Sequence, residues 1–137
     1  MAFRWILLIL VFAVASAGRA QKTDIVKLPV FSTGPRYGAG CGFVGVDPEP
    51  RVAIEAMIRD KYTVGILAWL HDTAAVYQAY GAEAVIRLER NGVMFAVNDL
   101  ALVEEIKRSK KKIDVCSGCS TWPEEMGQAV KMFSKRD

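Results

Sequence analysis

The residues of this chain that could do chemistry are first of all its three cysteines, two of which are closely spaced. Cys116 and Cys119 are separated by two residues, so their thiols could close a small disulfide ring, bind a metal or exchange electrons. In redox proteins with this spacing the first thiol lies at the start of a helix, whereas residues 120–123 separate this pair from the next predicted helix. The residue after Cys119 is serine, which excludes the histidine of a c-type haem attachment site. The pair is therefore kept as an alternative function, that of a thiol–disulfide redox protein.

The third cysteine, Cys41, supports a structural interpretation instead. It lies in a glycine-rich segment, and a bridge from it to Cys116 or Cys119 would close a loop of about 75 residues. Loop-closure entropy makes such a bridge worth about 4 kcal/mol. We prefer a structural disulfide that uses two of the three cysteines, and the sequence leaves the connectivity open. The remaining cysteine would be a buried thiol or would form an intermolecular bond.

The other motifs predict no catalytic, cofactor-binding or metal-binding residue. Three cysteines and His71 could supply four zinc ligands, but no spacing brings His71 near the cysteines. Residues 40–45 match G-x-G-x-x-G, yet they neither follow a buried strand nor open directly into a helix, as dinucleotide binding requires. With a single histidine available, no nucleophile–base pair emerges, so the sequence favours a protein that is not an enzyme.

One basic run, residues 107–112, could contact an anionic surface such as lipid headgroups or polysaccharide. Its candidate contact residues are Lys110, Lys111 and Lys112. The preferred interpretation is a solvated helix end, because positive side chains are stabilised by the carbonyl groups of the last helical turn.

The first twenty residues predict the compartment. Arg4 is followed by an apolar run over residues 5–14 and by the small residues Ala15 and Ala17, the layout of a signal peptide. The run is shorter than the roughly 20 residues of a membrane-spanning helix. We therefore predict a signal peptide over residues 1–17, cleaved after Ala17 or Ala20, and a secreted or periplasmic protein with no transmembrane segment in its mature chain.

Size and charge limit the class of protein and of partner. The formal net charge of +3 falls to +2 when Arg4 leaves with the leader, which gives no reason to expect nucleic acid as a partner. The roughly 120 remaining residues are enough for one domain with its own core. The partner is unknown from the sequence, and a protein is the class left open.

Periodicity and capping signals predict an all-α fold behind an irregular arm. Residues 21–46 are expected to form the arm, which is extended or an edge strand over 24–31 and too rich in glycine for a helix afterwards. Residues 47–137 are expected to form a helical domain in which Asp47 caps the first helix and Thr121–Glu124 form a capping box for the last. The five predicted helices cover residues 47–61, 63–70, 73–91, 98–108 and 121–133, with a short strand allowed at 113–115.

Residues 53–106 resemble a helical unit of the HEAT or armadillo type. The resemblance depends on residues 66–70, a short helix end with Trp69 and Leu70, and on residues 80–88, a longer helix with small residues at its centre. It implies antiparallel helical hairpins and a binding role. The sequence thus predicts an exported, non-catalytic binding or structural module with a stabilising disulfide.

Overall fold

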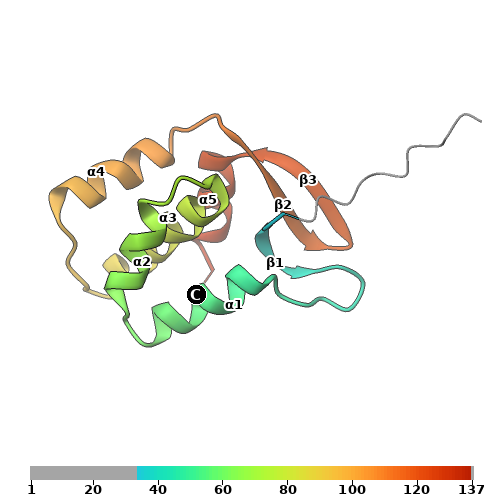
Figure 1. The fold of residues 1–137 in the computed structure, drawn as a ribbon, viewed down its shortest axis with the longest axis horizontal. Helices are drawn as coiled ribbons and strands as arrows, with labels where there is room; N and C mark the ends of the chain where they lie inside the picture. Colours follow the sequence, from blue (N-terminus) through green and yellow to red (C-terminus); the bar gives the residue numbers. More distant parts are fainter. Residues whose placement is uncertain (1–33, 137) are drawn as a thin grey trace, which may run out of the picture. The chain divides into compact units, whose positions relative to one another are not determined.

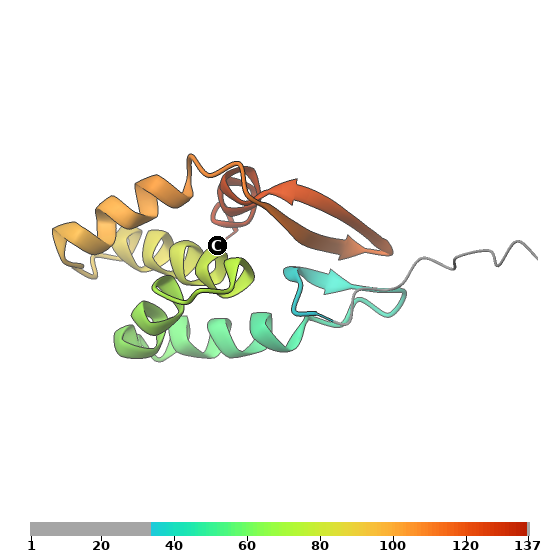
Figure 2. The same ribbon diagram turned by 45° about the horizontal axis from the view of Figure 1, so that its top comes forward.

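The computed structural model describes residues 34–136, which form five helices and one three-stranded sheet (Figures 1 and 2). The fold is therefore α+β, and the prediction of an all-α domain is wrong. The predicted leader and residues 21–33 of the arm lie outside the described residues. In chain order the elements are β1 (Tyr37–Cys41), α1 (Glu49–Arg59), α2 (Thr63–Leu70), α3 (Ala75–Arg90), α4 (Val97–Ile106), β2 (Lys112–Gly118), β3 (Ser120–Glu125) and α5 (Met126–Phe133).

The sheet has β2 at its centre. β1 pairs with β2 in parallel and β3 pairs with it antiparallel. Helices α1 to α4 form the crossover that a parallel pair requires, whereas β2 and β3 are joined by the two-residue turn of Gly118 and Cys119. Among the described helices none is long and apolar enough to cross a bilayer.

The predicted glycine-rich arm contains a strand, β1, which is followed by an irregular segment over residues 42–46. Gly38 lies opposite Cys116, and a Cβ atom at position 38 would lie 2.0 Å from the Cys116 carbonyl oxygen. The φ angle of Gly38 is also positive, at 152°. Glycine at this position therefore allows β1 to approach β2, so the composition that excludes a helix here is compatible with a strand.

The predicted capping box is the second error. Thr121 and Glu124 lie in β3, where they pair with Cys116 and Ile113 of β2, and helix α5 begins only at Met126. The strand expected at 113–115 is present but longer, because β2 runs from Lys112 to Gly118. β3 pairs with the edge of β2 that β1 leaves free. Pairing along that edge outweighs the local helix signal.

The four helices predicted between residues 47 and 108 are present: α2 has the predicted ends, and the other three have shifted ends. Helix α1 begins at Glu49 behind Pro48 and has no side-chain cap. Asp47, the expected cap, instead accepts a hydrogen bond from the Gly40 backbone N–H at 2.7 Å. The residue therefore fixes the connection between β1 and α1 rather than the first turn of the helix.

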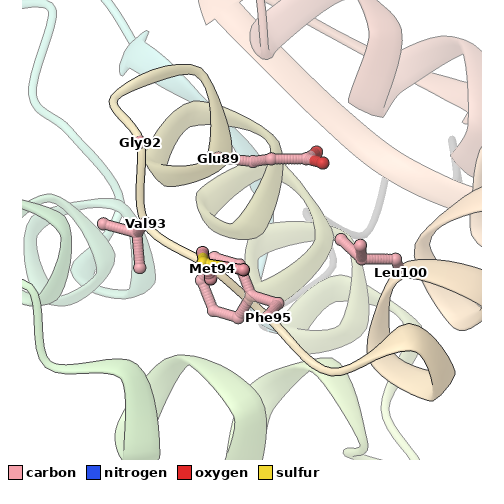
Figure 3. Close-up of a pocket in the computed structure, with 6 residues that line it drawn as sticks. All are labelled: Glu89, Gly92, Val93, Met94, Phe95 and Leu100. Atoms are coloured by element: carbon pink, nitrogen blue, oxygen red, sulfur yellow. The ribbon is translucent and has the colours of Figure 1, made fainter.

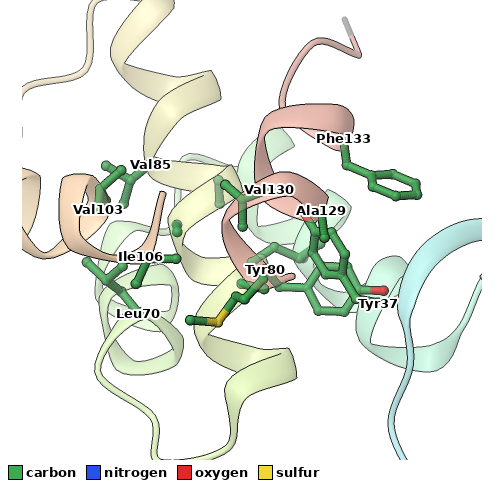
Figure 4. Packing of buried hydrophobic residues seen from close by; sticks show 14 of the residues in the cluster. Tyr37, Leu70, Tyr80, Val85, Val103, Ile106, Ala129, Val130 and Phe133 are labelled. Atoms are coloured by element: carbon green, nitrogen blue, oxygen red, sulfur yellow. The ribbon is translucent and has the colours of Figure 1, made fainter. Parts of the chain in front are cut away.

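Helix α3 runs through the middle of the core, which Figure 4 shows from close by. Its buried residues include Tyr80, Val85 and Leu88, and it packs against each of the other four helices. Tyr37 of β1 and Phe133 of α5 complete the core near the sheet, with their ring centroids 5.1 Å apart in an edge-to-face arrangement. The sheet and the helices thus share one apolar core.

Helices α2 and α3 approach each other closely at Gly81. A Cβ atom there would lie 2.3 Å from the backbone nitrogen of Leu70 and 2.6 Å from its Cα atom. These are backbone atoms, so a side chain at position 81 would push the two helices apart.

We expect Gly81→Ala to lower the free energy of unfolding by about 2 kcal/mol, because overpacking a core costs about 1–3 kcal/mol. In an unhindered helix the same exchange would stabilise the protein by about 1 kcal/mol, so the sign of the effect is diagnostic. Urea unfolding followed by tryptophan fluorescence measures it. Gly34→Ala is the control, since a Cβ atom at Gly34 meets nothing within 4 Å. Equal stability of the two variants would contradict the close helix contact.

Candidate functional site

A disulfide joins the sheet across its parallel pair of strands. Cys41 of β1 is bonded to Cys116 of β2, with the two Cα atoms 5.4 Å apart and 75 positions apart in the sequence. The prediction of a disulfide between two of the three cysteines is confirmed, and the pairing is now assigned. Cys116 is buried, whereas Cys119 is a free, exposed cysteine. The Cys116–Cys119 ring expected for a redox motif is therefore not formed in this structure.

The segment after Cys41, residues 42–46, forms a loop held at both ends, which we call the apolar loop. The Cys41 backbone N–H donates to the carbonyl oxygen of Val46 at 2.8 Å, and that of Gly42 donates to the carbonyl oxygen of Gly118 at 2.7 Å. Within the loop the Gly45 N–H donates to the Gly42 carbonyl oxygen at 3.1 Å. Together with the disulfide, these bonds fix the backbone of the loop.

The apolar loop exposes three large hydrophobic side chains. Phe43 is 94% exposed, Val44 80% and Val46 61%. A cluster of such side chains on one short, fixed loop is typical of an interaction surface, because single exposed apolar residues are scattered on most proteins. Sequence reasoning missed this loop, although two bulky apolar residues between Gly42 and Gly45 in a turn segment were a usable signal.

The apolar loop lies beside the turn of the β2–β3 hairpin, and the two together are called the sheet tip. They lie at the same end of the described unit in both views (Figures 1 and 2). Residues 37–46 and 115–123, which contain the sheet tip and the strand ends behind it, include no charged side chain. The sheet tip itself therefore presents apolar groups and one thiol, and the exposed Asp47 carboxylate, which accepts from the Gly40 N–H, lies beside it.

Two backbone nitrogens on the free edge of β3, those of Pro123 and Glu125, have no N–H available for a further strand. Ser117 and Ser120 flank the two-residue turn. In a hairpin of this kind the flanking residues form a hydrogen-bonded pair, after which bonded and non-bonded pairs alternate. The backbone nitrogen of Pro123 consequently faces outward, where proline offers no donor. The N–H of Glu125 donates to the Glu124 carboxylate at 2.8 Å. A partner strand would therefore find fewer backbone donors along this edge than an ordinary edge strand offers.

A buried polar cluster positions β1 and hence the start of the apolar loop. Arg51 and Glu83 form an ion pair through two hydrogen bonds of 2.6 and 2.8 Å, and the Tyr37 hydroxyl donates to Glu83 Oε2 at 2.5 Å. Arg51 Nε also donates to the Gly38 carbonyl oxygen at 2.8 Å, and the Gly38 N–H donates to the Tyr80 hydroxyl at 3.0 Å. The backbone N–H and carbonyl groups of Gly38, on the edge of β1 away from β2, thus form their hydrogen bonds with side chains.

Aromatic rings and a second ion pair surround this cluster. The Arg51 guanidinium carbon lies 4.8 Å from the centroid of the Tyr80 ring, within the range of a cation–π contact. On the outer side, Arg87 contacts Glu55 at 2.7 Å. Burial raises the pKa of Glu55, but hydrogen bonds from Arg87 and Arg51 outweigh that effect and leave the pKa below its usual value. The cluster extends from the core to the surface with its charges paired.

Stability should fall at alkaline pH because two tyrosines of the cluster resist ionisation. Burial, followed by the charge of Glu83, raises the pKa of Tyr37 well above its usual value, and burial raises that of Tyr80 to about 12. Both pKa values are near 10 in the unfolded chain, so this stabilisation is complete below pH 10 and is lost as the pH rises from 10 towards 12. In that range the ionisation of each tyrosine lowers the free energy of unfolding by up to about 1.4 kcal/mol per pH unit.

Urea unfolding between pH 9 and 11.5 measures this loss, in a Cys119→Ser background so that no free thiolate attacks the disulfide. The variant Tyr80→Phe should show a shallower decline than its parent. An unchanged slope in that variant would contradict the assignment of the alkaline loss to Tyr80.

The other residues singled out by the sequence do not join the sheet tip. Lys110, Lys111 and Lys112 are exposed at the start of β2, whereas Cys119 follows its end. His71 lies at the end of α2 and contacts Asp99 Oδ1 at 2.8 Å. Within residues 34–136 no group of His, Cys, Asp and Glu side chains could hold a metal ion.

A groove between α3 and α4, shown in Figure 3, is smaller than the hollow of about 480 Å³ that is lined by Glu124, Gln128, Lys131, Met132 and Lys135. The groove has a volume of about 220 Å³ and is lined by Glu89, Gly92, Val93, Met94, Phe95 and Leu100. Ligand sites of enzymes usually measure about 300–1,000 Å³. Glu89 is the one ionisable side chain of its lining, so the groove brings together no acid–base or nucleophilic pair.

Comparison with protein-family models, with curated proteins and with solved structures finds no match for this chain. The resemblance of residues 53–106 to HEAT and armadillo units therefore stays a prediction.

Proposed function

We propose that this protein is an exported, non-catalytic binding module that uses the apolar loop to bind a protein partner. One observation carries the proposal: Phe43 and Val44 are almost fully exposed on a backbone fixed by a disulfide and by hydrogen bonds at both ends. A loop that is already ordered loses little conformational entropy on binding, and an aromatic side chain is the usual anchor of a protein interface.

The charge of the surface favours a protein over a polyanion. Binding to nucleic acid or to anionic lipid depends on lysine and arginine, and residues 37–46 and 115–123 contain neither. An apolar pocket on another protein would bury the side chains of the loop without leaving a charge unpaired. This comparison supports a protein as the partner class.

Export is supported by the disulfide and by the predicted leader. Disulfides persist in oxidising compartments, and a bond such as Cys41–Cys116, which joins two strands of the sheet, is typical of exported proteins. Intact-mass and N-terminal analysis of the protein recovered outside the cytosol should show a chain that begins at Gly18 or Gln21 and carries one disulfide. A cytosolic chain that retains Met1 and three free thiols would contradict export.

Binding through the apolar loop can be tested by site-specific photocrosslinking in the cells that export the protein. The variant Phe43→p-benzoylphenylalanine should form a protein adduct on irradiation. The control is Met94→p-benzoylphenylalanine, because Met94 is equally exposed, at 93%, but lies in the groove between α3 and α4. The absence of an adduct from position 43, or equal labelling from both positions, would contradict the proposal.

A further inference from the structure

The two charged side chains that directly follow the apolar loop are both acidic. Asp47 is the next residue of the chain, Glu49 is the first residue of α1, and both are exposed. Asp47 Oδ1 accepts a hydrogen bond from the Gly40 N–H, and within residues 34–136 neither carboxylate forms an ion pair. Asp47 and Glu49, which we call the acidic border, therefore place two exposed negative charges on the α1 side of the loop.

No basic side chain of α1 neutralises the acidic border. Arg51 is only 2% exposed, and its guanidinium is paired with Glu83 in the core. Arg59 lies at the other end of α1 and contacts Asp60 at 2.9 Å. The exposed charge where the loop enters α1 is therefore negative, although the chain as a whole carries a formal net charge of +3.

The exposed apolar surface continues past the acidic border onto α1, into which the loop leads (Figure 1). Val52 is 59% exposed. It follows Glu49 by three residues, so the two side chains occupy neighbouring positions on one face of the helix. An apolar centre with a polar rim is the usual composition of a protein interface. The apolar loop, the acidic border and Val52 together have this composition.

The small size of the surface makes its charges important. A stable interface buries about 800 Å² on each partner, more than Phe43, Val44 and Val46 alone supply. In such an interface the charges of the rim control the rate of encounter and repel the wrong partners. Two carboxylates on one side of the loop slow the approach of an acidic surface and accelerate that of a basic one.

We infer that the partner of the apolar loop is a protein whose apolar pocket carries lysine or arginine on its rim, facing the acidic border. The inference rests on the proposed binding role of the loop and states the chemistry of its partner. Phe43 and Val44 enter the pocket, and the basic side chains pair with Asp47 and Glu49 outside it. The partner's basic residues lie on the α1 side only, because residues 115–123 on the other side of the loop carry no charge.

The test measures the yield of the photoadduct from Phe43→p-benzoylphenylalanine in the exported fraction of the cells. Adding Asp47→Asn/Glu49→Gln removes both charges, while the asparagine amide oxygen can still accept from the Gly40 N–H. The yield should fall about three- to tenfold, as expected for the loss of two ion pairs at a rim. Raising the salt concentration should lower the yield of the parent but change that of this variant little.

Two further variants separate local charge from net charge and from the geometry of the loop. Glu104→Gln/Glu105→Gln removes the same charge from two exposed residues of α4 and should keep the parental yield. Glu49→Lys leaves the Asp47–Gly40 hydrogen bond in place and reverses one charge. Its adduct yield should lie below that of Glu49→Gln, because a positive charge there repels a basic rim.

The outcomes distinguish this inference from the proposed function. An adduct with another protein whose yield responds neither to salt nor to the acidic border overturns the inference but keeps the binding role. An equal fall in the acidic-border and α4 variants also overturns it, because net charge would then explain the effect. An adduct of twice the chain mass would identify a second copy in place of a basic partner. The absence of any adduct from position 43 overturns both proposals.

Discussion

We expect Glu83→Gln to lower the free energy of unfolding by about 3–5 kcal/mol, the usual cost of removing one partner from a buried ion pair. Glu83 is completely buried, and its carboxylate accepts hydrogen bonds from Arg51 and Tyr37. The amide keeps the shape of the side chain but removes its charge. Arg51, only 2% exposed, would then retain a positive charge in the core without its buried counterion.

The matched control is Glu55→Gln on the outer side of the same cluster. The Glu55 carboxylate lies 2.9 Å from Arg51 and 2.7 Å from Arg87, but its side chain is 41% exposed. Ion pairs in contact with solvent contribute about 0–1 kcal/mol, so the two glutamates should differ severalfold. Urea unfolding of both variants measures the difference. Equal losses would show that burial does not determine the contribution of each carboxylate.

Removing the disulfide is expected to have the second large effect. The variant Cys41→Ala/Cys116→Ala should lose about 4 kcal/mol, because the bond closes a loop between positions 75 residues apart and so restricts the unfolded chain. This is a large part of the roughly 5–15 kcal/mol by which domains of this kind are stable. The urea midpoint of the variant, compared with that of the wild type, measures the loss.

Cys119→Ala is the control for the disulfide. Cys119 is exposed and free, and surface substitutions of this kind change stability by less than about 0.5 kcal/mol. Reducing the wild type with dithiothreitol should reproduce the loss seen in the double variant. A reduced wild type that unfolds at the same urea concentration as the oxidised protein would exclude a stabilising role for the bond.

Local sequence signals predicted the helices well because those signals act over a few residues. Pro48 near the start of α1 and Asn91–Gly92 after α3 mark helix ends that the structure retains within a few positions. The sheet was not predictable in this way. Tyr37 pairs with Val115, a residue far away in the sequence, and no periodicity within residues 37–41 predicts that partner.

The site was predictable only in part, for a similar reason. Spacing identified the cysteines, but the choice of Cys41 as the partner of Cys116 depends on the parallel pairing of β1 with β2. Glu83 and Arg87 are spaced as an ordinary helix-stabilising pair, and the sequence does not show that Glu83 is buried against Arg51. Burial of a charge depends on which elements pack together. The all-α prediction lacked the three-stranded sheet, so it could not show which charges are buried.

The four-helix crossover between β1 and β2 also sets the order of events in the newly made chain. Cys41 leaves the ribosome first, and Cys116 follows 75 residues later, which at about 5–20 residues per second takes about 4–15 s. During that interval Cys41 has no native partner. Cys119 then emerges just behind Cys116, so two thiols compete for Cys41 at almost the same moment. The choice between them is made by strand pairing, and the native disulfide is therefore a late product that requires nearly the whole chain.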